Sequence, residues 1–143
     1  IGLSKTGLLA SENTMKVHTH TYSGLYNPPA PVIEVGVRGP GQHSREVRVT
    51  ALVDSGVDAT MLPIQVLRSV GARYVQTRHV RGVTGTRQAA DTFLAVIQIG
   101  PRIIPIPGAV AVVRGEEAIL GRDVLNQLVI TLDGPALALE IVD

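Results

Sequence analysis

An acidic tripeptide interrupts a strand-like run in the first half of this chain. Residues 47–53 read Val-Arg-Val-Thr-Ala-Leu-Val, a run of β-branched and aliphatic residues that is typical of a β-strand entering a core. Asp54-Ser55-Gly56 follows directly, although strand interiors disfavour Asp and Gly. A carboxylate placed there lowers the stability of the fold, so its presence indicates that the protein uses it. Asp54 is therefore the first candidate for a functional side chain, and the tripeptide occurs once in the chain.

The composition favours one domain that is mainly β. The chain has 143 residues, of which 45% are hydrophobic, so it is long enough to bury a core and unlike a disordered segment. Only 3% are aromatic, so the core must consist of Val, Ile, Leu and Ala. Fifteen glycines and nine prolines predict many turns, which suit short strands better than long helices.

Charge and residue usage argue against several classes of protein. The net charge of +1, without aromatic stacking platforms, predicts no binding to nucleic acid. The absence of cysteine excludes disulfides, thiolate zinc sites and a cysteine nucleophile, but it leaves the compartment undecided. The longest apolar run, Ile103 to Val113, contains two prolines and is too short to span a bilayer, so we expect membrane contact only if an anchor lies outside this chain.

A pair of histidines is the one pattern that suggests a metal. His18 and His20 have the spacing of two ligands on one strand face, but no acidic residue lies near them in the sequence. The other histidines, His43 and His79, are distant in the sequence. We therefore expect neither a metal nor a cofactor.

The chain divides into an extension and a domain. Residues 1–31 read as an N-terminal extension or linker that ends in a stiff proline cluster, and Lys16 to Tyr22 alternates as a strand would. Residues 32–143 form the expected domain. Strands are expected at 32–37, 46–53, 92–99, 103–113, 128–132 and 136–142, and short helices at 63–70 and 122–127.

Three segments, in order, resemble the retropepsins, the retroviral-type aspartic proteases. Residues 51–60, Ala-Leu-Val-Asp-Ser-Gly-Val-Asp-Ala-Thr, resemble the active-site signature of that family. The segment Gly82-Val83-Thr84-Gly85 lies between strand-like arms, as the family's flap does. Residues 118–125, Ala-Ile-Leu-Gly-Arg-Asp-Val-Leu, are similar to its later Gly-Arg-Asn/Asp segment. The helix expected at 63–70 is more similar to cellular and bacterial relatives than to viral enzymes.

The resemblance implies an all-β, barrel-like fold with one or two short helices, and an aspartic endopeptidase that acts on peptides or proteins. Such enzymes use two facing carboxylates, one as base and one as acid, to activate water. This chain supplies only Asp54, so the second carboxylate has to come from another copy. The resemblance thus implies a two-fold homodimer with an Asp54 dyad and no cofactor. The C-terminal strand, 136–142, is expected to join the dimer sheet.

Further roles are implied residue by residue. Ser55 resembles the hydroxyl that bonds across the dimer axis, and Gly56 allows close approach of substrate. Asp58 resembles the acceptor of substrate amides, and Arg122 is expected to pair with it. Val57 replaces the usual Ala, which alters the pocket.

Three more features complete the expected site. Thr60 matches a supporting position of the signature, and Asp123 stands where Asn is commoner. Gly82, Val83, Thr84 and Gly85 would contact substrate as a flap. The arginines around that segment suggest acidic or polar substrate flanks; they are Arg78, Arg81 and Arg87.

Two alternatives remain open from the sequence. A chain of this fold can be a catalytically silent peptide-binding or dimerisation module. It can also be a protease that cuts only its own parent chain.

Overall fold

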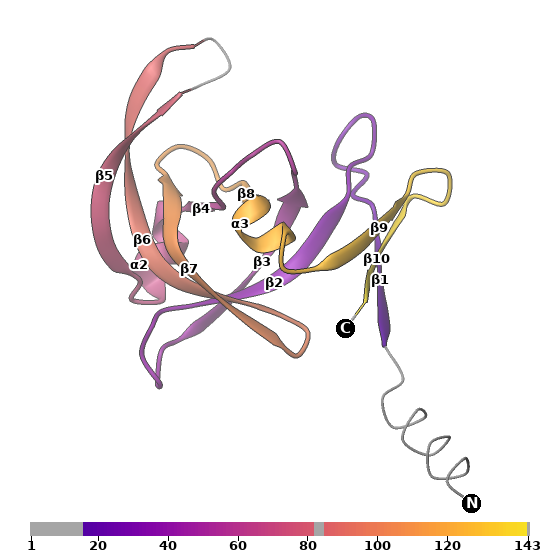
Figure 1. Cartoon of the computed structure of the whole chain (residues 1–143), viewed down its shortest axis with the longest axis horizontal. Helices are drawn as coiled ribbons and strands as arrows, with labels where there is room; N and C mark the ends of the chain where they lie inside the picture. The colour runs from indigo at the N-terminus through magenta and orange to yellow at the C-terminus, as the bar shows by residue number, and fades with distance from the viewer. Residues whose placement is uncertain (1–15, 82–84, 143) are drawn as a thin grey trace, which may run out of the picture.

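The computed structural model describes residues 16–81 and 85–142 as a β-structure with two short helices (Figure 1). The elements in chain order are β1 (Val17–Thr21), β2 (Val32–Arg38), β3 (Glu46–Val53), β4 (Met61–Pro63), α2 (Ile64–Ser69), β5 (Arg73–Arg81), β6 (Arg87–Ile99), β7 (Arg102–Val112), β8 (Ala118–Leu120), α3 (Arg122–Leu125), β9 (Val129–Asp133) and β10 (Ala138–Val142). The expected all-β class with short helices is confirmed.

Six strands close into a barrel. Hydrogen bonding runs in the order β2-β3-β8-β4-β7-β6, and β6 pairs back onto β2 with Ile97 opposite Val37. β3 is parallel to β8, and β4 is parallel to β7, whereas the other neighbours are antiparallel. Among the strands that the structure describes, β5 pairs only with β6, so the two strands form an arm that extends past the barrel at the upper left of Figure 1.

The barrel interior is aliphatic, as the composition predicts. Every second residue of β2 points into the barrel and is fully buried; these are Ile33, Val35 and Val37. Leu62 of β4 and Leu120 of β8 join them with no exposed surface. Burying each such side chain contributes about 1.5–3 kcal/mol, so this closed core is the main stabilising feature of the domain.

The two helices lie close to where the sequence places them. Pro63 stands immediately before α2, where its fixed φ suits a helix start, and Leu67 turns its side chain into the core. Gly71, with a φ of 70°, ends that helix in the left-handed conformation. α3 ends at Leu125 rather than at the expected Gln127, because the chain turns there to enter β9.

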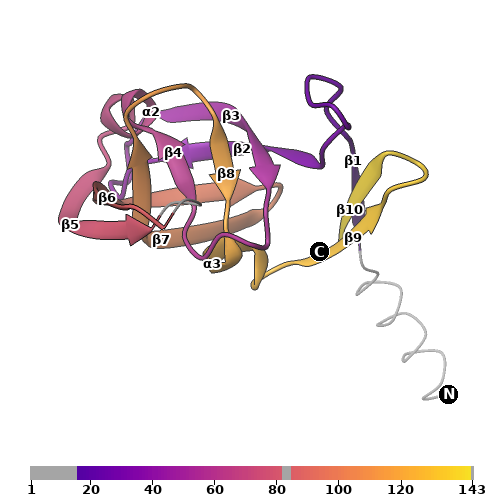
Figure 2. The same cartoon turned by 90° about the horizontal axis from the view of Figure 1, so that it is seen from above.

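A second, three-stranded sheet lies beside the barrel (Figure 2). β10 is its central strand, with β1 on one side and β9 on the other, all antiparallel. The strand expected within Lys16 to Tyr22 is confirmed as β1, and it pairs with β10. Leu139 and Ile141 face the barrel and are buried.

His18 and His20 lie on the face of β1 that is turned toward the barrel. His18 is opposite Ile141 and His20 is opposite Leu139 in the β1–β10 pair. They line a space of about 440 Å³, together with Glu34 of β2. Arg48, which also lines it, is ion-paired to Glu34 at 3.3 Å. This polar space separates the two sheets.

The charge state of His20 is expected to affect stability. Burial lowers the pKa of His20 from 6.5, the charge of His18 lowers it further, and Glu34 opposes the shift. The unfolded chain therefore binds this proton more readily, so the stability is complete above pH 6.5 and falls as the pH drops toward the folded pKa. Between about pH 7.5 and about pH 5, the wild type should lose more thermal stability than His20→Gln, as measured by calorimetry. Equal losses would contradict this.

No helix within residues 16–81 and 85–142 has the length and hydrophobicity that a membrane crossing requires.

Candidate active site

Asp54 stands at the point where β3 leaves the barrel. The Val53 N–H donates to the Pro31 carbonyl at 3.0 Å, and the Asp54 N–H donates to the Leu120 carbonyl at 3.1 Å. The strand end is thus held from both sides, by the start of β2 and by the end of β8. These two bonds fix the backbone position from which the carboxylate projects.

A tight turn then orients the carboxylate. The Val57 N–H donates to the Asp54 carbonyl at 3.2 Å, and the Gly56 N–H donates to Asp54 Oδ1 at 2.9 Å. A Cβ on Gly56 would lie 3.1 Å from Oδ1, so glycine leaves this bond room to form. Asp54 is half-buried, whereas Ser55 and Gly56 are exposed. The turn therefore presents an oriented carboxylate beside an open face.

The segment around α3 braces this turn from below. The Arg122 N–H donates to the Val57 carbonyl at 2.8 Å, and Arg122 Nη1 donates to the Ser55 carbonyl at 2.7 Å. The expected pairing of Arg122 with Asp58 is wrong, because among the described residues no ion pair joins them. The guanidinium instead reaches the turn itself, and Asp58 meets the segment through its carbonyl, which accepts the Asp123 N–H at 3.3 Å.

A buried polar network joins the same two segments deeper inside. Thr60 is fully buried, and its hydroxyl donates to Asp123 Oδ1 at 2.7 Å while accepting the Gly121 N–H at 3.1 Å. The Thr60 N–H donates to both oxygens of Asp123, at 3.1 and 3.0 Å. Asp123 Oδ1 also accepts the Val124 N–H at 2.9 Å. This network ties the Asp54 loop to α3 with charge-assisted hydrogen bonds.

Gly121 allows the two segments to approach so closely. A Cβ at this position would lie 2.8 Å from the Ala59 carbonyl carbon and 2.8 Å from the Val57 oxygen, both backbone atoms that cannot rotate away. We expect Gly121→Ala to lower the free energy of unfolding by about 2 kcal/mol or more, through overpacking. Urea denaturation measures it, and Gly134→Ala is the control, since no atom lies within 4 Å of that Cβ position. Equal stability of the two variants would contradict the clash.

The structure brings together most of the residues that the sequence singled out. Asp54, Ser55, Gly56, Val57 and Asp58 share one loop. Thr60 and Arg122 lie behind it, as the bonds above show. Gly85 lies at the start of the segment that leads into β6, whereas Gly82, Val83 and Thr84 lie outside the described residues. Within the described part of the chain, no three His, Asp or Glu residues are placed to hold a metal ion.

Comparison with known families agrees with this geometry. The family model described as "gag-polyprotein putative aspartyl protease" matches residues 43–127, more than half of the chain. The chain belongs to the retropepsin-like aspartic protease family. The matched span begins before β3 and ends after α3, so it contains the Asp54 loop and both segments that brace it. No curated protein matches the sequence significantly.

Solved structures of the family share the fold. The EIAV protease complexed with the inhibitor HBY-793 has 21% sequence identity and a TM-score of 0.57, over 76% of this chain and 93% of that one. A retropepsin-like aspartic protease from Rickettsia conorii has 13% identity and a TM-score of 0.58, over 90% of this chain and 94% of that one. This chain thus shares its fold with both the EIAV protease and the retropepsin-like protease from Rickettsia conorii.

Two contacts of this family member were not foreseen from the sequence. The sequence marks Asp123 only as a departure from the commoner Asn, yet its carboxylate is the acceptor that holds Thr60. A polar Thr60 within an otherwise apolar stretch was the available signal. The other contact is between Tyr26 and Glu117, whose hydroxyl and carboxylate are 3.1 Å apart. Nothing in the sequence spacing relates residues so far apart.

Proposed function

We propose that this chain is an aspartic endopeptidase that hydrolyses peptide bonds with Asp54 from each of two copies and an activated water. The observation that carries this proposal is the orientation of the Asp54 carboxylate. Oδ1 accepts the Gly56 N–H at 2.9 Å, and the loop that carries it is braced at Ser55 and Val57. A carboxylate held in one orientation at an open face is suited to proton transfer.

The chemistry requires a partner for this carboxylate. One carboxylate removes a proton from water, and a second, protonated one donates to the carbonyl oxygen of the scissile bond and then to the leaving amine. Two carboxylates that face each other at close range share one proton, so one serves as base and the other as acid. The Asp-Ser-Gly tripeptide occurs once in the chain, so the second copy of Asp54 comes from a second chain.

A two-fold homodimer meets this requirement. Its axis would pass between the two Asp54 loops, with each loop contributing the same residues. The exposed position of Ser55 supports a hydrogen bond from its hydroxyl across that axis. The Ser55 carbonyl is already occupied by Arg122, which would keep the loop rigid when the two chains meet.

Substrate would lie between the Asp54 loops and the β5–β6 arms. Gly56 and Val57 line its backbone in this arrangement, and the exposed Asp58 is available to accept substrate amides. The segment from Gly82 to Gly85 connects β5 to β6 in the sequence, and we assign it the role of a flap that excludes water over the bound peptide.

Digestion of a peptide mixture, combined with the mass of the chain in solution, tests the proposal. We expect a dimer that cleaves peptides and that a statine-type peptide, a mimic of the transition state, inhibits. A persistent monomer that cleaves nothing would favour a silent module. Cleavage confined to a longer version of the chain itself would favour self-processing.

A further inference from the structure

A groove runs beneath the β5–β6 arm. It has a volume of about 500 Å³, and its lining includes Met61 of β4, Val80 of β5, and Val110 and Val112 of β7. A second, smaller hollow of about 190 Å³ continues it, because the two share lining residues; these are Ala89, Ala90, Ala111 and Val113. The small alanine side chains leave the space open, and the floor is aliphatic.

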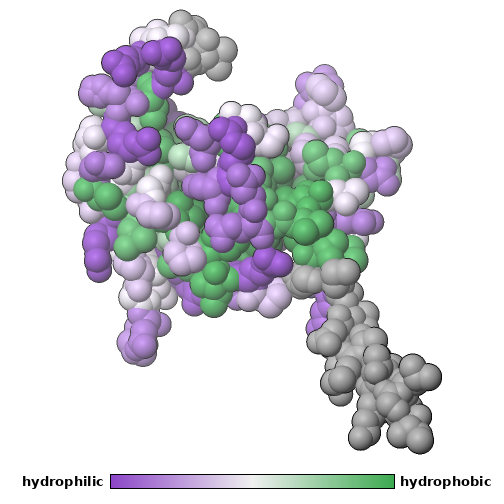
Figure 3. All heavy atoms as spheres, in the orientation of Figure 1, coloured by the Kyte–Doolittle hydropathy of each residue, from purple (hydrophilic) through white to green (hydrophobic). Residues whose placement is uncertain are grey.

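Three arginines stand around this aliphatic floor. Arg114 lines the larger hollow, and Arg68 of α2 lines the smaller one. Arg78 is opposite Ala90 in the β5–β6 pair, and it lies two residues from Val80, so it shares the face of the arm that lines the groove. We call this space the arginine-rimmed groove. Figure 3 shows that hydrophilic residues cover the outer part of the arm at the upper left.

The positive charge at the rim is not neutralised within the molecule. In residues 16–81 and 85–142, none of the three guanidinium groups forms an ion pair, and each residue is exposed. Of the described lining residues, Asp91 is the one with an acidic side chain, and its Oδ1 accepts the Thr77 hydroxyl at 2.8 Å. The groove is therefore complementary to a ligand that brings a negative charge with it.

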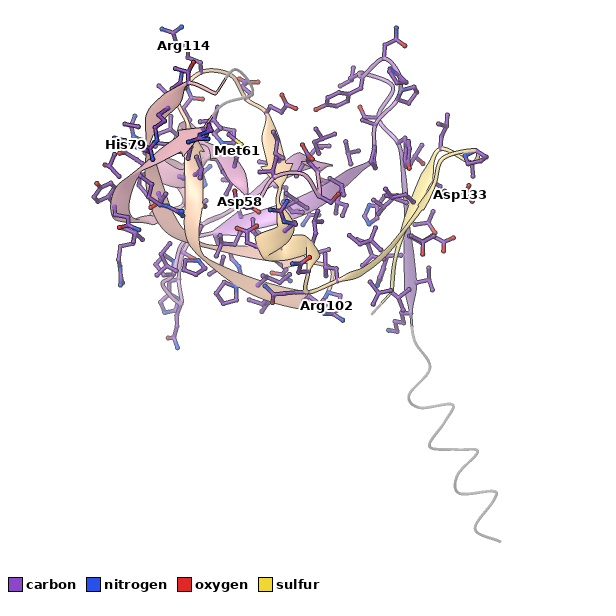
Figure 4. The ribbon with its side chains drawn as sticks, turned by 45° about the horizontal axis from the view of Figure 1, so that its top comes forward. Asp58, Met61, His79, Arg102, Arg114 and Asp133 are labelled. Atoms are coloured by element: carbon purple, nitrogen blue, oxygen red, sulfur yellow. The ribbon has the colours of Figure 1, made fainter. Side chains whose placement is uncertain are left out.

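The distance between Asp54 and the groove determines which residue of a bound substrate would carry the negative charge. Asp54 bonds to the end of β8 through Leu120, and Met61 is opposite Ile119 of the same strand. β8 thus separates them, so the floor of the groove begins two strand spacings, about 10 Å, from Asp54. An extended peptide advances about 3.3 Å per residue, so this corresponds to two or three residues from the bond that is cut. Figure 4 shows Met61 near Asp58, with His79 of β5 and Arg114 farther from Asp58 on the same side of the molecule.

We infer that the arginine-rimmed groove selects an acidic side chain of the substrate, two or three residues from the scissile bond, with Arg114 as the main determinant. This inference rests on the proposed function. The methylene groups of a Glu side chain would cover the aliphatic floor while its carboxylate reaches the arginines at the rim. In a symmetric dimer the groove occurs twice, so acidic residues are expected on both sides of the cut.

The experiment starts from the cleavage sites found in a peptide mixture. One cleaved sequence is then made in three forms, with Glu, Gln or Lys at the second or third residue from the cut, and kcat/KM is measured for each. Exposed ion pairs are worth little individually, so we expect the wild type to prefer Glu over Gln by about fivefold. The preference should shrink in about 1 M salt, where the screening length is about 3 Å.

Charge reversal separates a specificity role from a structural one. Arg114→Glu should reverse the order, so that the Lys peptide is cut faster than the Glu peptide, with the rate for Gln little changed. Arg45→Glu, an exposed change of the same charge in the β2–β3 turn, should leave the order as in the wild type. Equal losses for all three peptides in Arg114→Glu would overturn the inference.

The outcome also distinguishes this inference from the proposed function. If the wild type cuts all three peptides equally while Asp54→Asn cuts none, the groove has no charge preference and only the inference fails. If no peptide is cut, the proposed function fails, and the inference is decided by binding to the wild type of two labelled peptides from the mixture that differ only in Glu or Gln, measured by fluorescence anisotropy. Tighter binding of the Glu peptide supports it, and equal binding overturns it.

Discussion

Asp54→Asn is expected to abolish peptide cleavage, with kcat lowered by about 10³-fold or more, because an amide can neither remove a proton from water nor donate an acidic one. The fold should survive, since the side-chain oxygen of Asn can still accept the Gly56 N–H that orients Asp54. Asp133→Asn is the matched control: Asp133 lies in the three-stranded sheet, across the molecule from Asp58 in Figure 4, and should leave kcat unchanged. Cleavage by Asp54→Asn at the wild-type rate would remove Asp54 from the reaction.

Mixing the two proteins tests whether the dyad is shared between chains. Wild type and Asp54→Asn are unfolded together in equal amounts and refolded. If each active site needs Asp54 from both chains, only wild-type pairs are active, and the activity per total chain is about a quarter of the wild-type value. If one chain is sufficient, about half remains. The second result would contradict the homodimeric dyad while leaving Asp54 as a catalytic residue.

The sequence predicts β2, β3 and α2 well because their signals are local, whereas it assigns no separate strand to β4, β5 or β8. The alternation in β2 and β3, Pro63 before α2, and Gly71 after it each act within a few residues, and the structure has these elements where the pattern places them. The loop of Asp54 was also foreseen, since an acid followed by Gly after an aliphatic strand is unusual.

The contacts between distant segments were harder to predict. The sequence predicts an ion pair between Arg122 and Asp58, yet the Arg122 guanidinium donates to the Ser55 carbonyl. The Arg122 N–H also donates to the Val57 carbonyl, so both the backbone and the side chain of Arg122 bond to the turn. Pairing of β1 with β10 likewise depends on where these two strands lie in space, and no spacing in the sequence encodes that.

The network around Thr60 is expected to be the largest single contribution of a polar side chain to the stability of the site. Asp123→Ala removes the acceptor of the Thr60 hydroxyl, the Thr60 N–H and the Val124 N–H. Thr60 is fully buried, so water cannot easily replace that acceptor. We expect the free energy of unfolding to fall by about 3–4 kcal/mol, because hydrogen bonds to a charged group are lost and buried donors remain unpaired. Urea denaturation measures this.

Asp123→Asn separates the role of the acceptor from that of the charge. Oδ1 of Asp123 accepts three of the bonds, so an Asn that places its oxygen there keeps them and loses only the 3.0 Å contact from the Thr60 N–H to Oδ2. The expected loss is about 1 kcal/mol, since neutral hydrogen bonds are weaker than charge-assisted ones. If Asp123→Asn were as unstable as Asp123→Ala, the negative charge itself, rather than the acceptor geometry, would hold the Asp54 loop to α3.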